Sequence, residues 1–412
     1  MRKLLSFVLF FLVGSSLYAG GYRVSIQGQK QLAMGHTGVA VISSAESAFF
    51  NPAGLSYLDG KLNVSIGGSA IFSTVKFQNI GDSYEAETDS PLGTPLNLYA
   101  SYKINDWLTA GIAVYTPYGS RVEWEKDWAG SHLVNNINLK AIFVQPTISL
   151  KVNDYLSVGG GPIWVNGSVE FNRNLNTGTT SVGTGGRSNV TIEKTGITAW
   201  GYNVGLMLKP TEKLNIGFNY RSKVIMEAED GDADFENIAI LPDGKFDAEL
   251  PLPAEVTIGL SYKFCDKFLF AFDYNFAQWS EYEALVVEFD NAAGTSTNLR
   301  NYKDSSTYRF GLQYEAHKKF TVRGGIYFDE SPVQDGYFAP ETPRNDSVGY
   351  TAGLSYHVND KLSIDASFLY LHFKEIDNSY DYIDNGNGTF SSFGGTYKSS
   401  VFAPGIGVSY KL

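Results

Sequence analysis

From residue 61 to the C-terminus, apolar and polar residues alternate over ten or more positions at a time, and turn-forming residues interrupt the alternation. A period of two over such lengths is typical of β-strands whose two faces meet different surroundings. The pattern predicts fourteen strands, an even number. Their expected ranges are 61–78, 94–104, 107–117, 137–151, 155–171, 191–208, 213–226, 250–264, 267–289, 302–315, 319–329, 347–357, 361–374 and 396–412.

The connections between these ranges alternate between short and long. The short ones, such as 105–106, 152–154 and 358–360, contain Asn and Asp, which tolerate the left-handed backbone of tight hairpins. The long ones are rich in Gly, Asp, Asn and Ser, and they include 80–93, 172–190, 227–249 and 375–395. Short periplasmic turns and long extracellular loops are typical of bacterial outer-membrane barrels. A soluble β-sandwich is the alternative, but it would need neither such long strands nor so strict an alternation.

Arginine positions assign the two faces of several strands. In the strand around Tyr308 to Tyr314, apolar side chains on one face alternate with Arg309 and Gln313 on the other. In the next strand, Phe320 and Val322 lie on one face and Arg323 lies on the other. By the same count Arg221 and Lys223 share one face. An arginine facing lipid at mid-bilayer would cost about 2–4 kcal/mol. We therefore expect Arg221, Lys223, Arg309 and Arg323 to face the lumen and the alternate apolar residues to face lipid.

The first residues are typical of a secretory signal peptide. Arg2 and Lys3 precede an apolar run of ten residues, 4–13, and small residues lead to Ala19. The run is about half of the ~20 residues that a membrane-spanning helix needs. We expect residues 1–19 to be a signal peptide that is cleaved near Ala19.

Composition and charge narrow the class of protein further. The chain has 27 Phe, 26 Tyr and 43 Gly in 412 residues, yet its mean hydropathy is −0.14, as expected if lipid-facing and water-facing residues alternate. Removing Arg2 and Lys3 takes the formal charge from −11 to −13, which disfavours nucleic acid as a partner. Cys265 is the only cysteine, so neither an intramolecular disulfide nor a thiolate metal cluster can form. We expect no cofactor and no metal.

Residues 20–60 do not alternate like the rest. Ser43 and Glu46 have the spacing of a helix capping box, and Pro52 disfavours helix at Asn51, so a short helix is expected over 44–50. A fourteen-stranded barrel has room for such a segment in its lumen, and a polar lumen without a plug would leak. A disordered arm is the alternative, but Phe49, Phe50 and Leu55 favour packing.

This segment resembles the N-terminal hatch of the FadL family of outer-membrane hydrophobic-compound transporters, which also includes TodX-type aromatic hydrocarbon channels. Asn51, Pro52 and Ala53 match the family's Asn-Pro-Ala motif. Shorter matches follow in order along the chain, at 35–40, 115–119, 146–158, 217–223, 252–254, 279–280 and 331–333. The resemblance implies an all-β fold, a 14-stranded antiparallel transmembrane β-barrel with a small N-terminal helical hatch inside the lumen. The expected domains are residues 20–60 as the hatch and 61–412 as the barrel.

The last strand resembles the C-terminal signal that the barrel-assembly machinery recognises. Gly407, Tyr410 and Leu412 carry this likeness, although Leu412 stands where Phe or Trp is usual. We therefore expect the barrel-assembly machinery and outer-membrane lipids as partners, and the cell outer membrane of a Gram-negative bacterium as the location. The resemblance implies a monomer.

The resemblance also implies a transport route for long-chain fatty acids, with capture between extracellular loops, transfer to a pocket in the lumen and sideways exit through the wall. Pro117, Pro146 and Pro162 are compatible with such an exit, because proline removes a ladder hydrogen bond and is found at strand edges and bulges. Local bending of the strands explains these prolines equally well.

Candidate ligand-binding residues follow from the chemistry of a fatty acid, which needs an apolar slot with a cation at one end. Trp124, Trp128 and Leu133 lie in a stretch, 121–133, that has helical character and could form an outer groove. Leu369, Leu371 and Phe373 are apolar on a predicted lumen face, where they fit a ligand pocket or contacts to the hatch. Arg221, Lys223, Arg309 and Arg323 are candidate carboxylate partners, unless they pair with lumen acids such as Glu255 and Asp273.

Three other functions stay open. Uptake of neutral aromatic hydrocarbons would use the same scaffold, and a general diffusion porin would share the barrel without needing the hatch. An outer-membrane hydrolase would need a nucleophile and a positioned base. None of the five histidines, His36, His132, His317, His357 and His372, lies in a recognisable nucleophile or metal motif, so we do not expect an enzyme.

Overall fold

Residues 21–125, 127–175 and 188–412 are described by a computed structural model, and their strands close into a barrel of fourteen antiparallel strands, as the sequence predicted. The strands are β1 (Leu62–Ser69), β2 (Phe72–Asn79), β3 (Glu85–Glu87), β4 (Leu96–Lys103), β5 (Leu108–Glu123), β6 (Asn136–Lys151), β7 (Leu156–Asn174), β8 (Asn189–Leu208), β9 (Leu214–Arg221), β10 (Val224–Glu236), β11 (Gly244–Leu252), β12 (Glu255–Cys265), β13 (Phe268–Ala277), β14 (Ala284–Phe289), β15 (Thr295–Leu299), β16 (Ser305–His317), β17 (Phe320–Asp329), β18 (Ser347–His357), β19 (Leu362–Phe373), β20 (Ile376–Asp384) and β21 (Phe390–Lys411). The helices are α1 (Gln29–Leu32), α2 (Ser47–Phe50) and the 3₁₀ turns η1 (Pro52–Tyr57) and η2 (Trp279–Glu281).

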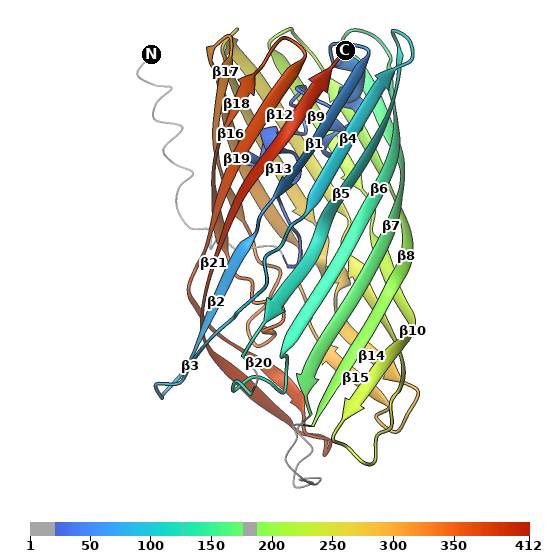
Figure 1. Cartoon of the computed structure of the whole chain (residues 1–412), viewed down its shortest axis with the longest axis vertical. Coiled ribbons are helices and arrows are strands. Elements are labelled where there is room, and N and C mark those ends of the chain that lie inside the picture. The colour runs from blue at the N-terminus through green and yellow to red at the C-terminus, as the bar shows by residue number, and fades with distance from the viewer. Residues whose placement is uncertain (1–20, 126, 176–187) are drawn as a thin grey trace.

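The barrel closes where the last strand meets the first. β21 pairs antiparallel with β1, so that Val64 lies opposite Tyr410 and Gly67 opposite Gly407. Several wall strands run in two parts, including β9 with β10, β11 with β12 and, as Figure 1 shows, β1 with β2. Closure gives the strands of the wall a neighbour on both sides, which the bilayer requires because it offers no water to unpaired backbone groups.

The alternation predicts the facing of the strands correctly. Leu312 and Val322 are 44% and 46% exposed on the outer surface, whereas Arg309 and Arg323, on the alternate positions of the same two strands, are 5% and 7% exposed. Arg221 is also buried on the lumen side of β9. Lys223 is a correction: it lies in the two-residue break between β9 and β10, where the alternation stops, and its ammonium binds the exposed Glu281 at 2.7 Å.

One rim of the barrel carries the short turns and the C-terminus, and we assign it to the periplasm (Figure 1). At the other rim the strands extend beyond the predicted ranges. The acidic stretch expected as a loop at 227–249 is mostly the hairpin of β10 and β11, and β21 begins at Phe390 rather than at 396. β5 continues past Pro117 to Glu123, so residues 121–123 pair with β6, and the described residues of 121–133 contain no helix.

The wall is irregular on the side where the prolines lie. The β5–β6 pairing shifts register between Tyr115 and Tyr118, and the β6–β7 pairing is interrupted around Pro146 and Pro162. The β4–β5 ladder ends at Leu98 opposite Val114, so the outer half of β5 lacks β4 as a neighbour.

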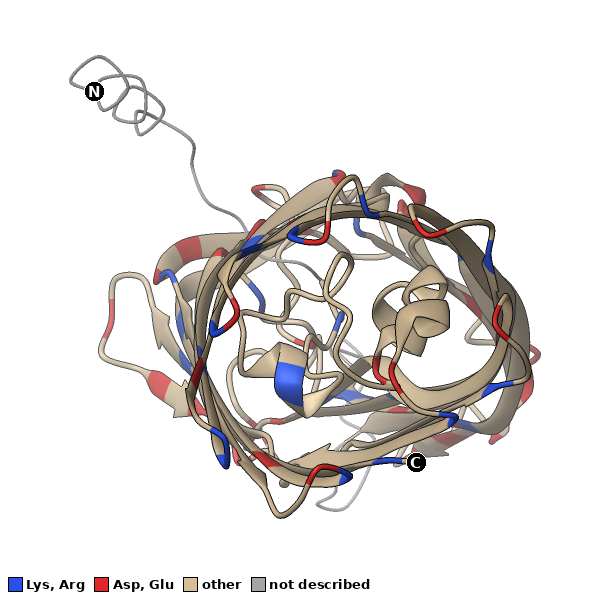
Figure 2. Ribbon diagram, turned by 90° about the horizontal axis from the view of Figure 1, so that it is seen from above, with Lys and Arg blue, Asp and Glu red and all other residues tan. Residues whose placement is uncertain are grey.

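The N-terminal segment, residues 21–58, lies inside the barrel, as a view along its axis shows (Figure 2). Most of its side chains are buried, and α1, α2 and η1 contact the wall strands. The expected capping box is wrong: α2 begins at Ser47, and the Glu46 carboxylate accepts a hydrogen bond from the backbone N–H of Gln29 at 3.1 Å. The predicted signal peptide, 1–19, lies outside the described residues. No helix among the described residues is both long and apolar enough to cross a membrane.

Replacing Leu312 by arginine tests the assignment of the outer face. We expect Leu312→Arg to lower the free energy of unfolding by about 2–4 kcal/mol, because the guanidinium would face lipid near the middle of β16. Urea titration of barrels refolded into lipid vesicles measures this, with Leu312→Phe as the matched control. A loss no larger than that of the control would contradict the facing of β16.

Candidate functional site

The Asn51-Pro52-Ala53 element joins the N-terminal segment to the wall. The Asn51 amide donates hydrogen bonds to the carbonyl oxygens of Val39 at 2.8 Å and Leu206 at 3.0 Å, and its own oxygen accepts one from Ala53 N–H at 3.1 Å. A Cβ on Gly205 of β8 would lie 2.1 Å from the Asn51 side-chain oxygen. The motif is therefore seated against the backbone of β8, where only glycine leaves room.

A network of buried charges holds the rest of the segment. The Arg23 guanidinium donates to Thr307 Oγ1 and Asp329 Oδ1, both at 2.6 Å, and lies 3.5 Å from Glu255 Oε2. Two strands further along the wall, Lys30 lies 3.7 Å from the carboxylate of Asp365 on β19. Burial raises the pKa of the Glu46 carboxyl to about 7. Polar wall residues and polar residues of the segment thus satisfy one another inside the lumen, from the outer ends of β12 and β17 toward the periplasmic rim.

Three of the four predicted lumen cations belong to this network rather than to a cavity with an apolar lining. Arg221 donates to the backbone oxygen of Phe49 at 2.9 Å, and Arg323 binds Gln313 at 2.7 Å and Ser355 at 2.5 Å. Arg309 is buried among the charges of Arg23, Asp273 and Asp329. The structure does not bring Lys223 to them, for the reason given above.

An apolar cavity of about 110 Å³ lies in the extracellular half of the barrel. Its wall is formed mainly by aliphatic and aromatic side chains of β6, β7, β8, β10, β11 and β14, such as Leu139, Phe171, Ile192, Met226, Phe246 and Val287. Tyr22 of the N-terminal segment and Leu133 also line it. The predicted Leu133 is therefore at a cavity that suits a hydrophobic ligand.

Two guanidinium groups line the same apolar cavity. Arg173, at the end of β7, donates to Ser296 Oγ at 3.3 Å, and Arg300 forms a buried ion pair with Glu341. The Glu341 carboxylate also acts electrostatically on Arg173. The cavity therefore combines mostly apolar walls with these three charged groups, and Glu249 also lines it.

These three charged residues were missed from the sequence. Arg173 lies two and four positions after Phe171 and Val169, which line the cavity on the same face, so continuing the alternation by two residues would have identified it. Arg300 and Glu341 lie outside any strand, where no periodicity signals which way a side chain points.

The two tryptophans expected in an outer groove are buried. The rings of Trp124 and Trp128 stack with their centroids 4.1 Å apart. The indole N–H of Trp124 donates to Pro340 O at 3.1 Å, and that of Trp128 donates to Val134 O at 2.7 Å. Phe77 and Phe393 pack against Trp128. The stacked pair closes the loop region of the barrel.

A second cavity, of about 290 Å³, occupies the irregular side of the wall, between β2 and β5. Pro91 and Leu92 line it together with Arg23 and Arg344. The predicted Leu369, Leu371 and Phe373 also line it, and they pack in one cluster with Ile26 and Leu32 of the N-terminal segment. Both of the roles expected for these three residues, cavity lining and contact to the N-terminal segment, are compatible with this position.

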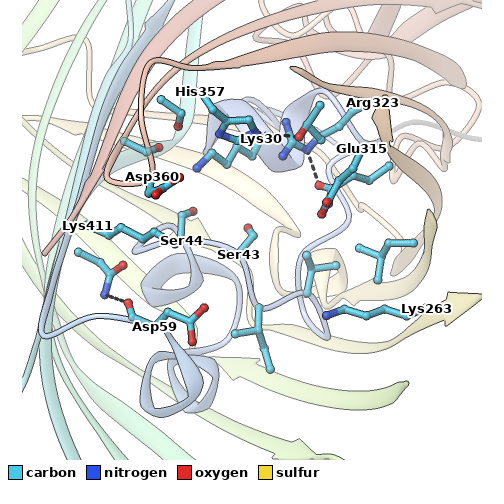
Figure 3. Close-up of a pocket in the computed structure, with 18 of the residues that line it drawn as sticks. Lys30, Ser43, Ser44, Asp59, Lys263, Glu315, Arg323, His357, Asp360 and Lys411 are labelled. Carbon is cyan, nitrogen blue, oxygen red and sulfur yellow. Dashed lines mark hydrogen bonds between the residues drawn. The ribbon is translucent and has the colours of Figure 1, made fainter. Parts of the chain in front are cut away.

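A third, polar cavity of about 1010 Å³ opens at the periplasmic rim. Charged side chains surround it, among them Lys30, Lys263, Glu315, Asp360 and Lys411 (Figure 3). It therefore differs in character from the apolar cavity, and residues 21–58 lie between the two ends of the barrel.

The comparisons with known proteins fit this geometry. A family model described as outer membrane protein transport protein (OMPP1/FadL/TodX) matches residues 10–412. The chain belongs to this family. FadL/TodX proteins are outer-membrane transporters and channels rather than enzymes, and the chain is accordingly an outer-membrane transporter of hydrophobic compounds.

Individual relatives within the family have low sequence identity to this chain. The long-chain fatty acid transport protein of Escherichia coli K12 is 22% identical, covering 88% of this chain and 90% of the relative. A crystal structure of a Pseudomonas aeruginosa FadL homologue superposes with a TM-score of 0.81 at 18% identity, covering 95% and 99% of the two chains. The Pseudomonas putida toluene transporter TodX gives 0.73 at 17% identity, covering 96% and 99%. These structures share the fold with this chain.

Replacing Asn51 tests whether the motif holds the N-terminal segment in place. Asn51→Ala removes three hydrogen bonds and leaves two buried carbonyl groups without this partner, at a cost of about 1–3 kcal/mol. We expect faster hydrogen exchange across residues 21–58. Asn63→Ala is the matched control, because Asn63 donates only to the nearby Asp59 carbonyl. Equal exchange in the two variants would contradict the anchoring role.

Proposed function

We propose that this protein takes up long-chain fatty acids and that the apolar cavity is where it binds them. The observation that carries the proposal is the pair of guanidinium groups, Arg173 and Arg300, in a cavity lined mostly by apolar side chains. A cation in an apolar slot suits a molecule with a long hydrocarbon chain and one carboxylate. The relatives named as long-chain fatty acid transport proteins are consistent with this choice.

The route that we propose begins at the loops and ends in the wall. Residues 21–58 act as a hatch, because they fill the lumen between the apolar cavity and the periplasmic vestibule and are held by buried polar contacts. A ligand blocked in that direction leaves sideways, through the wall cavity between β2 and β5. The wall there lacks β4 as a partner for the outer half of β5, which leaves room for an opening.

Neutral aromatic hydrocarbons are the second candidate ligands. Solved structures that share the fold include toluene transporters, and most of the cavity lining would suit a ring as well as a chain. A general diffusion porin is less consistent with the structure, because residues 21–58 occupy its lumen. We further propose that the protein is a monomer, is exported with cleavage near Ala19, is inserted by the barrel-assembly machinery and performs no catalysis.

Uptake of labelled oleate by cells that express the protein tests this function. We expect Arg173→Gln to lower oleate uptake about tenfold or more, because a charge-assisted hydrogen bond contributes about 1.5–3 kcal/mol. Lys223→Gln is the matched control, since Lys223 pairs with Glu281 on the exposed surface and lines none of the three cavities described above.

Labelled toluene provides the discriminating arm of the same experiment. Uptake of toluene but not of oleate by the unaltered protein would favour the aromatic ligand. Oleate uptake that is unchanged in a correctly inserted Arg173→Gln variant would remove the role proposed for the guanidinium groups.

A further inference from the structure

The connection between β17 and β18, residues 330–346, folds inward and separates the two apolar-lined cavities. Ala339, Glu341 and Thr342 line the apolar cavity, while Pro343 and Arg344 line the wall cavity. Most residues from 338 to 346 are buried although they belong to no helix or strand. We call residues 339–344 the partition, because residues at its start line the apolar cavity and those at its end line the wall cavity.

Side chains from other parts of the chain hold the partition, since it belongs to no ladder of the wall. Trp124 Nε1–H donates to Pro340 O at 3.1 Å, and Ser120 and Ser399 donate to Glu341 O and Pro343 O, each at 3.3 Å. Arg344 donates to the backbone oxygen of Arg23 at 3.1 Å. These are single hydrogen bonds, each contributing about 1 kcal/mol.

The ion pair between Glu341 and Arg300 is the strongest of these contacts. Both side chains are less than 10% exposed, and the Arg300 guanidinium lies 5.4 Å from the centroid of the Tyr380 ring. A buried carboxylate whose cation is taken away is strongly destabilised. The partition therefore depends on Arg300 staying available to Glu341.

The Glu341 side chain already presents a carboxylate to Arg300, and a carboxylate is also the head group of a fatty acid. A carboxylate ligand in the apolar cavity competes for Arg300 and can replace Glu341 there without leaving the guanidinium unpaired. Arg173 lines the same cavity, so a second guanidinium group is available to a ligand carboxylate. A neutral ligand has no carboxylate that could replace Glu341 in the ion pair with Arg300.

We propose that Glu341 is an internal stand-in for the ligand carboxylate and a specificity-determining residue for transport. A ligand with a terminal carboxylate displaces Glu341 from Arg300, the partition is released, and the apolar cavity becomes continuous with the wall cavity. A neutral molecule of the same shape binds in the apolar cavity but leaves the partition closed. This inference rests on the proposed function, which supplies the anionic ligand.

Oleate and oleyl alcohol, which share the hydrocarbon chain and differ in the head group, provide the test. Transport is measured into vesicles that contain the purified full-length barrel. We expect the unaltered protein to favour oleate, and Glu341→Gln to reduce the oleate to oleyl alcohol ratio about tenfold, because the neutral amide binds Arg300 weakly and loosens the partition for both ligands. Glu341→Asp, which keeps the charge, should retain the preference.

The affinity for oleate is a second measurement. If Glu341 were purely structural, its replacement would not make oleate bind more tightly. Glu341→Gln removes the internal competitor, so oleate should bind more tightly, by about tenfold, while the affinity for oleyl alcohol stays the same. Glu281→Gln is the matched control, because it removes one acid from an exposed pair with Lys223. An unchanged ratio together with unchanged or weaker oleate binding overturns the proposal.

A cross-link keeps the proposal testable if Glu341→Gln does not fold. Ser399 Oγ donates to Pro343 O, so cysteines at 343 and 399, in a background with Cys265→Ser, can be joined by a short thiol reagent that a reductant cleaves. We expect the joined form to bind oleate but not to transport it, and the reductant to restore transport. Equal transport by the joined and cleaved forms overturns the proposal.

The outcomes also separate this inference from the function on which it rests. If the unaltered protein moves no more oleate than vesicles without protein, the proposed function fails and the inference falls with it. If oleate is transported but neither Glu341→Gln nor the cross-link alters it as described, the role of Glu341 fails alone.

Discussion

The structure depends on one constraint, that backbone N–H and C=O groups in a bilayer need a partner within the protein. Pairing of β21 with β1 satisfies it for the barrel as a whole. The outer half of β5 is the exception, because its ladder with β4 ends at Val114. There the N-terminal segment takes part: Val24 N–H donates to Pro117 O at 2.8 Å, and Gly119 N–H donates to Tyr22 O at 3.1 Å. The segment inside the lumen and the irregular wall are thus parts of one arrangement.

Polarity divides the lumen along its length. Around the N-terminal segment, buried charges of the wall face buried charges of the segment, and each group is stabilised by the other because neither could be buried alone. Toward the loops, aromatic and aliphatic side chains replace them and enclose the apolar cavity. Arg221 and Arg323 donate to neighbouring carbonyl, amide and hydroxyl groups, whereas Arg173 and Arg300 line the apolar cavity.

The apolar cavity and the wall cavity are close to each other in the lumen. The apolar and wall cavities lie on two sides of residues 339–344, and Tyr22 and Arg23 also line one each. Two elements without regular structure therefore meet between the apolar cavity and the interrupted part of the wall. Such elements can rearrange without breaking the ladders of the barrel.

Periodicity in the sequence determined the number of strands, the facing of Leu312 and Val322 and the burial of Arg221, Arg309 and Arg323, since a strand has only two faces and charge in lipid is costly. The unpatterned residues before 61 likewise indicated a segment separate from the wall. Only the tertiary structure decided which cations meet a cavity, because side chains such as Arg300 and Glu341 come from connections that are far apart in sequence and carry no period. It also decided the partner of Glu46, where a contact with Gln29 replaced the local cap that Ser43 suggested. Local patterns specify faces and turns, while the pairing of buried charges depends on which connections meet once the barrel has closed.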